Sequence, residues 1–386
     1  MGMQKIASFA FATGGTQIVE LSRVQQMEAQ GKLAYLESLV VHLDVTDLDD
    51  VGAGAAVEDI HGLLAGLTVE AGDGYYGPRG LSGADLSALS FVHKGRATKN
   101  IELEGDIATT SASNQIRQLV WEYPYAYFGG KFGDFSPAVK TLANNGGRIT
   151  VNMGTTIASA TAGTFTIYAK TFGGDELRAV PRIISERQGV DVLEGGGLGR
   201  GLMLSAILKN AGDWADGDID EISVRCDGQN VVSGVEAEVL LYDYPTPVAE
   251  STAQLFQNTG IGPIDGAGGA PRFIPIYPPT NPSGQQVSKL HSANAWTYSI
   301  RGNETAANLT WITTRALRMS VGHAVDQYAA MVGDRTSVED LIRNNPESAV
   351  RTKTLSKTLL TKPALQGYLP LKLLSPEATR RAGIVR

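Results

Sequence analysis

The side chains whose types and spacing best fit a binding role are four aromatic residues at alternate positions: Trp121, Tyr123, Tyr125 and Tyr127. In an extended strand, alternate side chains lie on one face. A row of aromatic rings offers a platform on which sugar rings can stack, but it is more typical of a hydrophobic core or a subunit contact. Pro124 inside the run predicts an edge strand or the end of a strand. We therefore favour a core or contact face and keep a sugar-binding platform as the alternative.

Patterns for catalysis, nucleotide binding or metal binding are weak. Gly195–Gly201 is rich in glycine but lacks the strand-to-helix context of a nucleotide loop, so it predicts a flexible turn. The acids between Asp213 and Glu221 do not match the calcium-loop pattern, because Glu221 stands where that loop needs Gly. The five histidines are too far apart for metal-ligand spacing: His42, His61, His93, His291 and His323. The sequence predicts no catalytic residue, no cofactor and no metal, and hence a protein that is not an enzyme.

The cysteine content and the apolar segments bear on the compartment in which the chain folds. Cys226 is the single cysteine, so an intrachain disulfide is excluded, and its strand-like neighbours predict a buried thiol. No apolar run approaches the ~18 residues of a membrane span. The apolar stretch near the N-terminus is too short for a signal peptide. We therefore expect synthesis and folding in a cytoplasm.

Charge is distributed unevenly along the chain. Residues 350–386 hold eight Lys and Arg against one Glu, a net charge of +7, so the remainder of a chain whose total is −7 carries −14. The basic residues that we take as candidate assembly contacts are Arg351, Lys353, Lys357, Lys362, Lys372, Arg380 and Arg381. Eight leucines accompany them, so the arm is expected to dock into apolar grooves with its charges at the rim. We favour an acidic neighbouring subunit as the partner of this arm. Packaged genome is less favoured, because it would suit an arm denser in Lys and Arg. A lipid surface is a further alternative.

Short strands separated by turn signals dominate the rest of the sequence, which has no strand–helix–strand rhythm. The expected strands are 35–45, 63–70, 100–107, 115–127, 148–153 and 164–172, then 202–209, 219–227, 235–244, 296–301 and 309–321. A helix is expected over 17–30, and shorter ones are expected to open at Ser82 and at Ser136-Pro137. Residues 260–286, rich in Gly and Pro, are expected to form a long loop at an outer surface or around a neighbour. This pattern predicts an all-β chain of sandwich or jelly-roll type.

The order of these elements predicts four segments. Residues 1–32 form an N-terminal arm and helix, 33–175 a first jelly roll and 176–325 a second one. Residues 326–386 form a C-terminal helix followed by the basic arm. The two halves are of similar length, but no residue-by-residue repeat relates them.

Three short motifs resemble the double jelly-roll major capsid proteins of tailless, internal-membrane icosahedral bacteriophages. They are Ile18–Arg23 before the first strand, Leu81–Leu86, and Trp121–Ala126 followed by Asp134-Phe135. The resemblance covers about residues 17–325; the arm matches no pattern of that family.

The resemblance implies two jelly rolls per chain and a homotrimer that forms a pseudo-hexagonal tile of an icosahedral shell. It also implies a place in the virion, contacts with other capsid proteins such as a vertex protein, and an internal lipid membrane beneath the shell. A jelly-roll spike or lectin that binds a receptor or carbohydrate is the alternative function, and a β-sandwich hydrolase or lyase is a weaker one.

Overall fold

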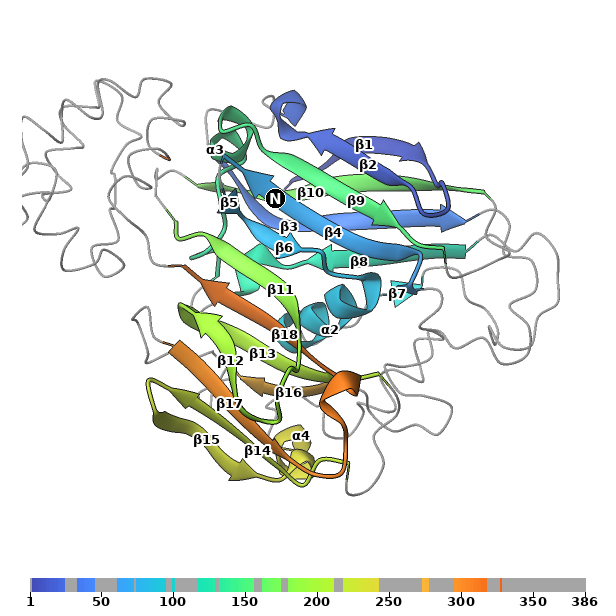
Figure 1. Cartoon of the computed structure of the whole chain (residues 1–386). Coiled ribbons are helices and arrows are strands. Elements are labelled where there is room, and N and C mark those ends of the chain that lie inside the picture. The colour runs from blue at the N-terminus through green and yellow to red at the C-terminus, as the bar shows by residue number, and fades with distance from the viewer. Residues whose placement is uncertain are drawn as a thin grey trace, which may run out of the picture.

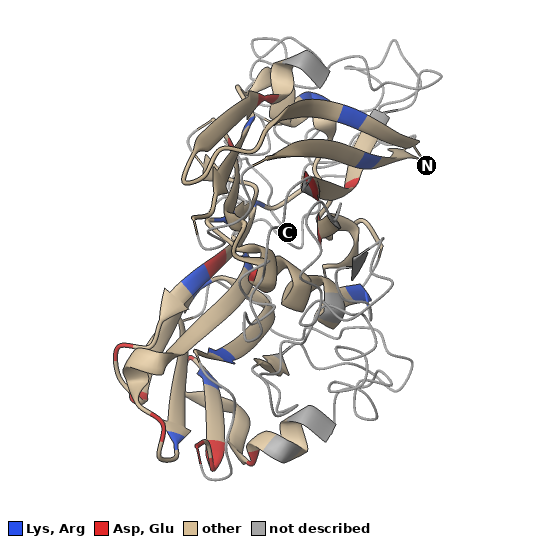
Figure 2. Ribbon diagram, turned by 90° about the vertical axis from the view of Figure 1, so that its right-hand side faces the viewer, with Lys and Arg blue, Asp and Glu red and all other residues tan. Residues whose placement is uncertain are grey.

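Strands make up most of the regular structure in the described part of the chain, which forms two stacked β-sandwiches (Figures 1 and 2). The coordinates are a computed structural model. The structure describes residues 2–24, 33–45, 61–72, 74–94, 99–100, 117–128, 132–155, 162–174, 180–211, 218–242, 273–277, 295–317 and 327.

Eight strands form the two sheets of the first sandwich. They are β1 (Gly2–Ala10), β2 (Thr16–Glu20), β3 (Leu33–Val45), β4 (Leu64–Ala71), β5 (Gly74–Tyr75), β8 (Arg117–Tyr123), β9 (Arg148–Met153) and β10 (Gly163–Gly174). One sheet has the order β1-β10-β3-β8, extended at its edge by β7 (Lys99–Asn100), and the other has the order β2-β9-β4-β5. When these eight strands are counted along the chain, the first sheet holds the first, eighth, third and sixth. The sheet that faces it holds the second, seventh, fourth and fifth. This is the strand order of a jelly roll.

The second sandwich repeats this topology strand for strand. Its strands are β11 (Ile183–Gly189), β12 (Glu194–Arg200), β13 (Leu202–Asn210), β14 (Glu221–Cys226), β15 (Gln229–Val235), β16 (Phe273–Tyr277), β17 (Ala295–Arg301) and β18 (Leu309–Ala316). The sheets are β16-β13-β18-β11 and β12-β17-β14-β15, and β6 (Gly77–Arg79) adds to the first of them beside β11. The prediction of an all-β chain with two jelly rolls is confirmed, and the two halves share one topology.

Helices are short and lie in the connections between strands. They are α2 (Gly83–Lys94), α3 (Val139–Asn144), α4 (Ala237–Tyr242) and the 3-10 turns η1 (Leu21–Val24), η2 (Tyr125–Tyr127) and η3 (Ala306–Asn308). Ser82 caps α2 as predicted: its Oγ accepts from the Asp85 amide, and the Asp85 carboxylate accepts from the Ser82 amide. The helix expected to open at Ser136 begins instead at Val139, with Ala138 at its N-cap.

Alternation along the strands places the predicted residues in the core. Phe165, Ile167 and Ala169 on β10 are buried in the first sandwich. Ile222, Val224 and Cys226 on β14 are buried in the second, so the predicted buried thiol is confirmed.

The helix predicted over 17–30 is wrong where the structure describes it. Thr16–Glu20 is a strand that pairs with β9, and only Leu21–Val24 turns helically. The helical spacing of Ile18 and Leu21 was misleading, because Ile18 is 53% exposed while Val19 and Leu21 are buried. The buried residues therefore follow the strand period of two.

The predicted turn at Gly195–Gly201 is also wrong, since most of it is strand β12. Glycines are needed there because side chains of neighbouring strands lie over the backbone. A Cβ on Gly196 would stand 2.2 Å from the Tyr298 ring, and one on Gly199, whose φ is +87°, 2.2 Å from the Arg315 guanidinium. The two register shifts of this strand fall at these glycines.

The proline-rich stretch 260–286 is not wholly a loop. Phe273–Tyr277 forms β16 at the edge of its sheet, paired with β13, and Phe273, Ile274 and Ile276 are buried. Pro275 is tolerated because an edge strand leaves one side without ladder bonds. The rest of the stretch lies outside the described residues.

Candidate assembly interface

The two sandwiches share a continuous hydrophobic core. Sheet β16-β13-β18-β11 is buried on both faces. Its inner face, with Leu208 and Trp311, lines the core of the second sandwich. Its outer face, with Ile207 and Ile312, belongs to the same cluster as the core of the first sandwich. The contact between the jelly rolls is therefore packed like a domain interior.

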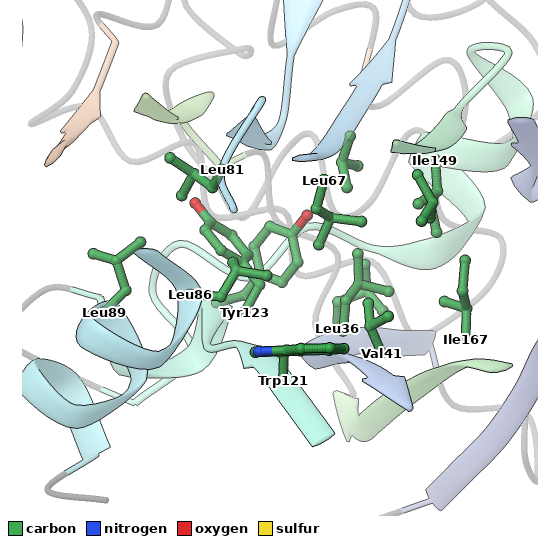
Figure 3. Packing of buried hydrophobic residues seen from close by; sticks show 14 of the residues in the cluster. Leu36, Val41, Leu67, Leu81, Leu86, Leu89, Trp121, Tyr123, Ile149 and Ile167 are labelled. Atoms are coloured by element: carbon green, nitrogen blue, oxygen red, sulfur yellow. The ribbon is translucent and has the colours of Figure 1, made fainter. Parts of the chain in front are cut away.

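Helix α2 fills the space between the first sandwich and this outer face (Figure 1). Leu86 and Leu89 are fully buried, and in Figure 3 they lie beside Tyr123 and Trp121 of β8. Leu86 directly follows Asp85 in the capped first turn of α2. The hydrogen bonds between Ser82 and Asp85 therefore also fix the position from which the Leu86 side chain points into the junction.

A row of hydroxyl groups crosses the junction. The Tyr123 hydroxyl lies 2.7 Å from Ser185 Oγ on β11, and Ser185 Oγ lies 2.7 Å from Thr314 Oγ1 on β18. Nearby, the Tyr125 hydroxyl donates to the carbonyl of Tyr76 over 2.7 Å. Burial raises the pKa of Tyr123 and of Tyr125 far above the usual tyrosine value, so both hydroxyls stay protonated. These bonds satisfy polar groups that would otherwise be costly to bury.

Ion pairs flank the hydroxyl row. Arg187 Nε on β11 lies 3.2 Å from the fully buried Asp85 carboxylate at the start of α2. Glu186 on the other face of β11 bonds Arg315 of β18 and lies 3.3 Å from Arg79 of β6. Only the Asp85 side of this pair is buried, since the Arg187 side chain is 41% exposed, so loss of Arg187 would leave a buried carboxylate without its ion pair. The pair joins α2 of the first jelly roll to β11 of the second.

Strand β6 carries the first jelly roll into a sheet of the second. Gly77–Arg79 pairs in parallel with Ile184–Glu186 of β11. Gly77 has φ +149°, and a Cβ there would stand 2.5 Å from the Tyr125 hydroxyl. The close approach of this strand to the tyrosines therefore needs a residue without a side chain.

We expect the substitution Gly77→Ala to lower the free energy of unfolding by roughly 1–3 kcal/mol, because it adds both backbone strain and a clash. The measurement is the urea midpoint followed by circular dichroism. Gly197→Ala is the matched control, since a Cβ at Gly197 meets nothing within 4 Å. Equal midpoints for the two variants would contradict this account of β6.

The aromatic row proposed from the sequence lies mostly inside the protein. Trp121, Tyr123 and Tyr125 have no exposed surface, so the interpretation of an aromatic contact face open to a partner is wrong for these three. β8 ends at Tyr123, just before Pro124, as the proline predicted, and Tyr125–Tyr127 form a 3-10 turn. Tyr127 alone is half-buried, with its ring edge-on to that of Phe132.

The basic candidates from Arg351 to Arg381 lie outside the described residues, so the arm remains a prediction. Sequence reasoning missed the junction residues Asp85, Ser185, Arg187 and Thr314. One signal could have found this junction. Residues 202–208 are an almost continuous apolar run, which is typical of a strand buried on both faces.

The described residues offer little for metal or membrane chemistry. Among them, no group of three or more His, Cys, Asp or Glu side chains is placed to hold a metal ion. No helix in the described ranges is long and apolar enough to cross a membrane.

Comparison with known proteins finds likeness in structure. No protein-family model matches the sequence, and no curated protein matches it. Among solved structures, the chain is similar to the STIV MCP of Sulfolobus Turreted Icosahedral Virus, with 10% identity, a TM-score of 0.47, and 81% of this chain and 96% of that chain covered. It is also similar to the capsid of PBCV-1 (11%, TM-score 0.44, 81% and 93% covered) and to the major capsid protein P2 from Bacteriophage PM2 (9%, TM-score 0.41, 81% and 95% covered). These are capsid proteins, the class that the sequence motifs resemble.

Proposed function

We propose that the chain is the major capsid subunit of an icosahedral virus and forms pseudo-hexameric homotrimers. The observation that carries this proposal is the fixed pair of jelly rolls with one topology. The role is structural, and the protein acts through its surfaces. Its place is the virion, after synthesis and assembly in the cytoplasm of the host.

The geometry of the pair favours a closed ring of three chains. Each chain supplies two units of one topology, held in one relative position by a shared core, the Tyr123–Ser185–Thr314 row and the Asp85–Arg187 pair. Six such units close around an axis when three chains meet head to tail. Jelly rolls also suit a lattice, because their short strand edges limit uncontrolled pairing between sheets.

The alternative of a carbohydrate-binding spike has lost its supporting feature. That function relied on Trp121, Tyr123 and Tyr125 as an exposed stacking platform, and all three rings are buried. A structural role needs no such platform.

The basic arm suggests which partners the trimer binds. The arm is expected to pack on an acidic neighbouring subunit or on the inner side of the shell, where an internal lipid membrane would lie. Contacts with other capsid proteins, such as a vertex protein, belong to the same proposal, and contact with the genome is less favoured.

The oligomeric state is the first test. We expect multi-angle light scattering of the purified chain to give three times the mass of 40.9 kDa across a wide concentration range. A monomer that persists at high concentration would overturn the trimer.

A further inference from the structure

The sheet β1-β10-β3-β8 of the first jelly roll has the same place in its sandwich as β11-β18-β13-β16 has in the second. In the second jelly roll the first jelly roll covers the centre of this outer face, with Ser185 and Thr314 at 0% exposure, while its margin at Arg187 is exposed. In the first jelly roll the corresponding face is open along the edge strand β1, whereas Thr166, Val40 and Ser38 further into the sheet are buried. Met3, Lys5 and Ser8 of β1 point outward and are exposed, and Met3 is 60% exposed.

A matching pair of hydroxyl residues marks both faces. Ser8 of β1 stands opposite Thr166 of β10, and their oxygens are 3.1 Å apart. Ser185 of β11 stands opposite Thr314 of β18, and their oxygens are 2.7 Å apart. Each pair joins the first and last strands of its jelly roll. Within the chain, the Tyr123 hydroxyl of the other jelly roll completes the second pair.

The covering element also has an equivalent. Helix α2 joins the fifth and sixth strands of the first jelly roll and packs beside the sixth, β8; α4 holds the same position in the second and packs beside β16. Leu86 and Leu89 of α2 are fully buried in the hydrophobic cluster that the two jelly rolls share, whereas Val239 of α4 is 47% exposed. An apolar residue on the covering helix therefore lies open in the second jelly roll, as Met3 does on the open sheet.

We infer that these two open surfaces meet between copies: the face around Met3, Lys5 and Ser8 binds the α4 side of the second jelly roll of the next copy. The inference rests on the proposed function and names the contact that would build the trimer. Charge agrees with it, because Glu236 at the start of α4 is exposed while Lys5 lies on the open face.

The difference in polarity between the two faces fits their roles. The face covered within the chain presents Ile207 and Ile312, which never meet water once the chain is folded. The open face presents Lys5 and Ser8, which keep a separate subunit soluble before assembly. Contacts between different surfaces of identical copies form either a closed ring or an open filament. We expect this one to close after three copies, because each copy supplies two units of one topology.

A cysteine pair tests the contact directly. The native Cys226 is buried, so the double variant Met3→Cys/Val239→Cys presents two new reactive thiols. After treatment with a short bismaleimide, we expect a covalent trimer as the end product on a denaturing gel. The control Met3→Cys/Val192→Cys places the second thiol on another exposed residue, 51% exposed at Val192, and is expected to run as a monomer.

Light scattering of the untreated double variant separates the possible failures. A trimer in solution that gives only monomer bands, or the same bands as the control, would overturn this contact and leave the proposed trimer standing. A crosslinked dimer as the end product would indicate a two-fold contact and also overturn the inference. A monomer in solution for both the variant and the unmodified chain would overturn the proposed function as well.

Discussion

Replacing Tyr123 with Ala is expected to expose the Cys226 thiol, although the two residues belong to different jelly rolls. Tyr123 is fully buried at the junction, and removal of a buried aromatic side chain costs about 3–5 kcal/mol. The hydrophobic cluster that contains Tyr123 extends into the β13–β18 sheet, whose other face lines the core around Cys226. Unfolding should therefore be cooperative across the chain, and Ellman's reagent should label Cys226 at a lower urea concentration.

The control for this experiment is Tyr123→Phe, which removes only the hydroxyl. Ser185 and Thr314 remain bonded to each other in that variant, so the expected loss is about 1 kcal/mol. The midpoint for thiol labelling should move together with the midpoint for circular dichroism. If Tyr123→Ala shifts the circular dichroism but leaves Cys226 protected, the jelly rolls unfold independently and the shared-core account is wrong.

The second large effect is expected on acidification. His61 accepts a hydrogen bond from Trp121 Nε1 at Nδ1, and burial, assisted by the positive charge of Lys209, lowers the pKa of His61 from 6.5 to about 4. His93 lies edge-on to Phe128. Burial lowers the pKa of His93 to about 3, and a hydrogen bond with the backbone of Tyr127 opposes this shift only in part. Both histidines are therefore neutral in the folded protein at pH values where an unfolded chain would bind protons.

The direction of the pH effect follows from proton binding. Below pH 6.5 the unfolded chain binds a proton at His61, whereas the folded protein binds one there only near pH 4. The free energy of unfolding is therefore unaffected by His61 above pH 6.5 and decreases as the pH falls from 6.5 to about 4. The gap between the two pKa values corresponds to at most about 3 kcal/mol for His61. We expect urea denaturation to show this loss between pH 7 and pH 4.5.

The variant His61→Gln tests the assignment, since its amide oxygen can still accept from Trp121. The difference in free energy of unfolding between pH 7 and pH 4.5 should shrink by about 2 kcal/mol in this variant. His93→Gln should give a separate, additional reduction. An unchanged pH dependence in both variants would show that other groups cause the acid sensitivity.

The regular part of this fold was predictable from the sequence, because the strands that bury one face alternate clearly. Phe165, Ile167 and Ala169 are the best example. The errors arose where tertiary contacts decide the local structure. The strand at Thr16–Glu20 depends on its distant partner β9, and β12 depends on Tyr298 and Arg315 lying over its glycines.

The candidate interface was predictable only in part. The sequence drew attention to Trp121 and Tyr123 but could not say that they face inward, because an exposed aromatic row and a buried one have the same spacing. The junction joins β6 and α2 to β11 and β18, which lie far from them along the chain, and no local pattern links Asp85 to Arg187 or Tyr123 to Ser185. The equivalence of Ser8 and Thr166 with Ser185 and Thr314 emerges only once the strand order is known.

Electron microscopy of the purified protein tests the central claim most directly. If three chains each contribute two fixed jelly rolls, class averages viewed down the axis should show a near-hexagonal particle with six lobes and true three-fold symmetry. Particles with two lobes, or assemblies with two-fold or four-fold symmetry, would contradict the claim that this chain forms the pseudo-hexameric tile of a capsid.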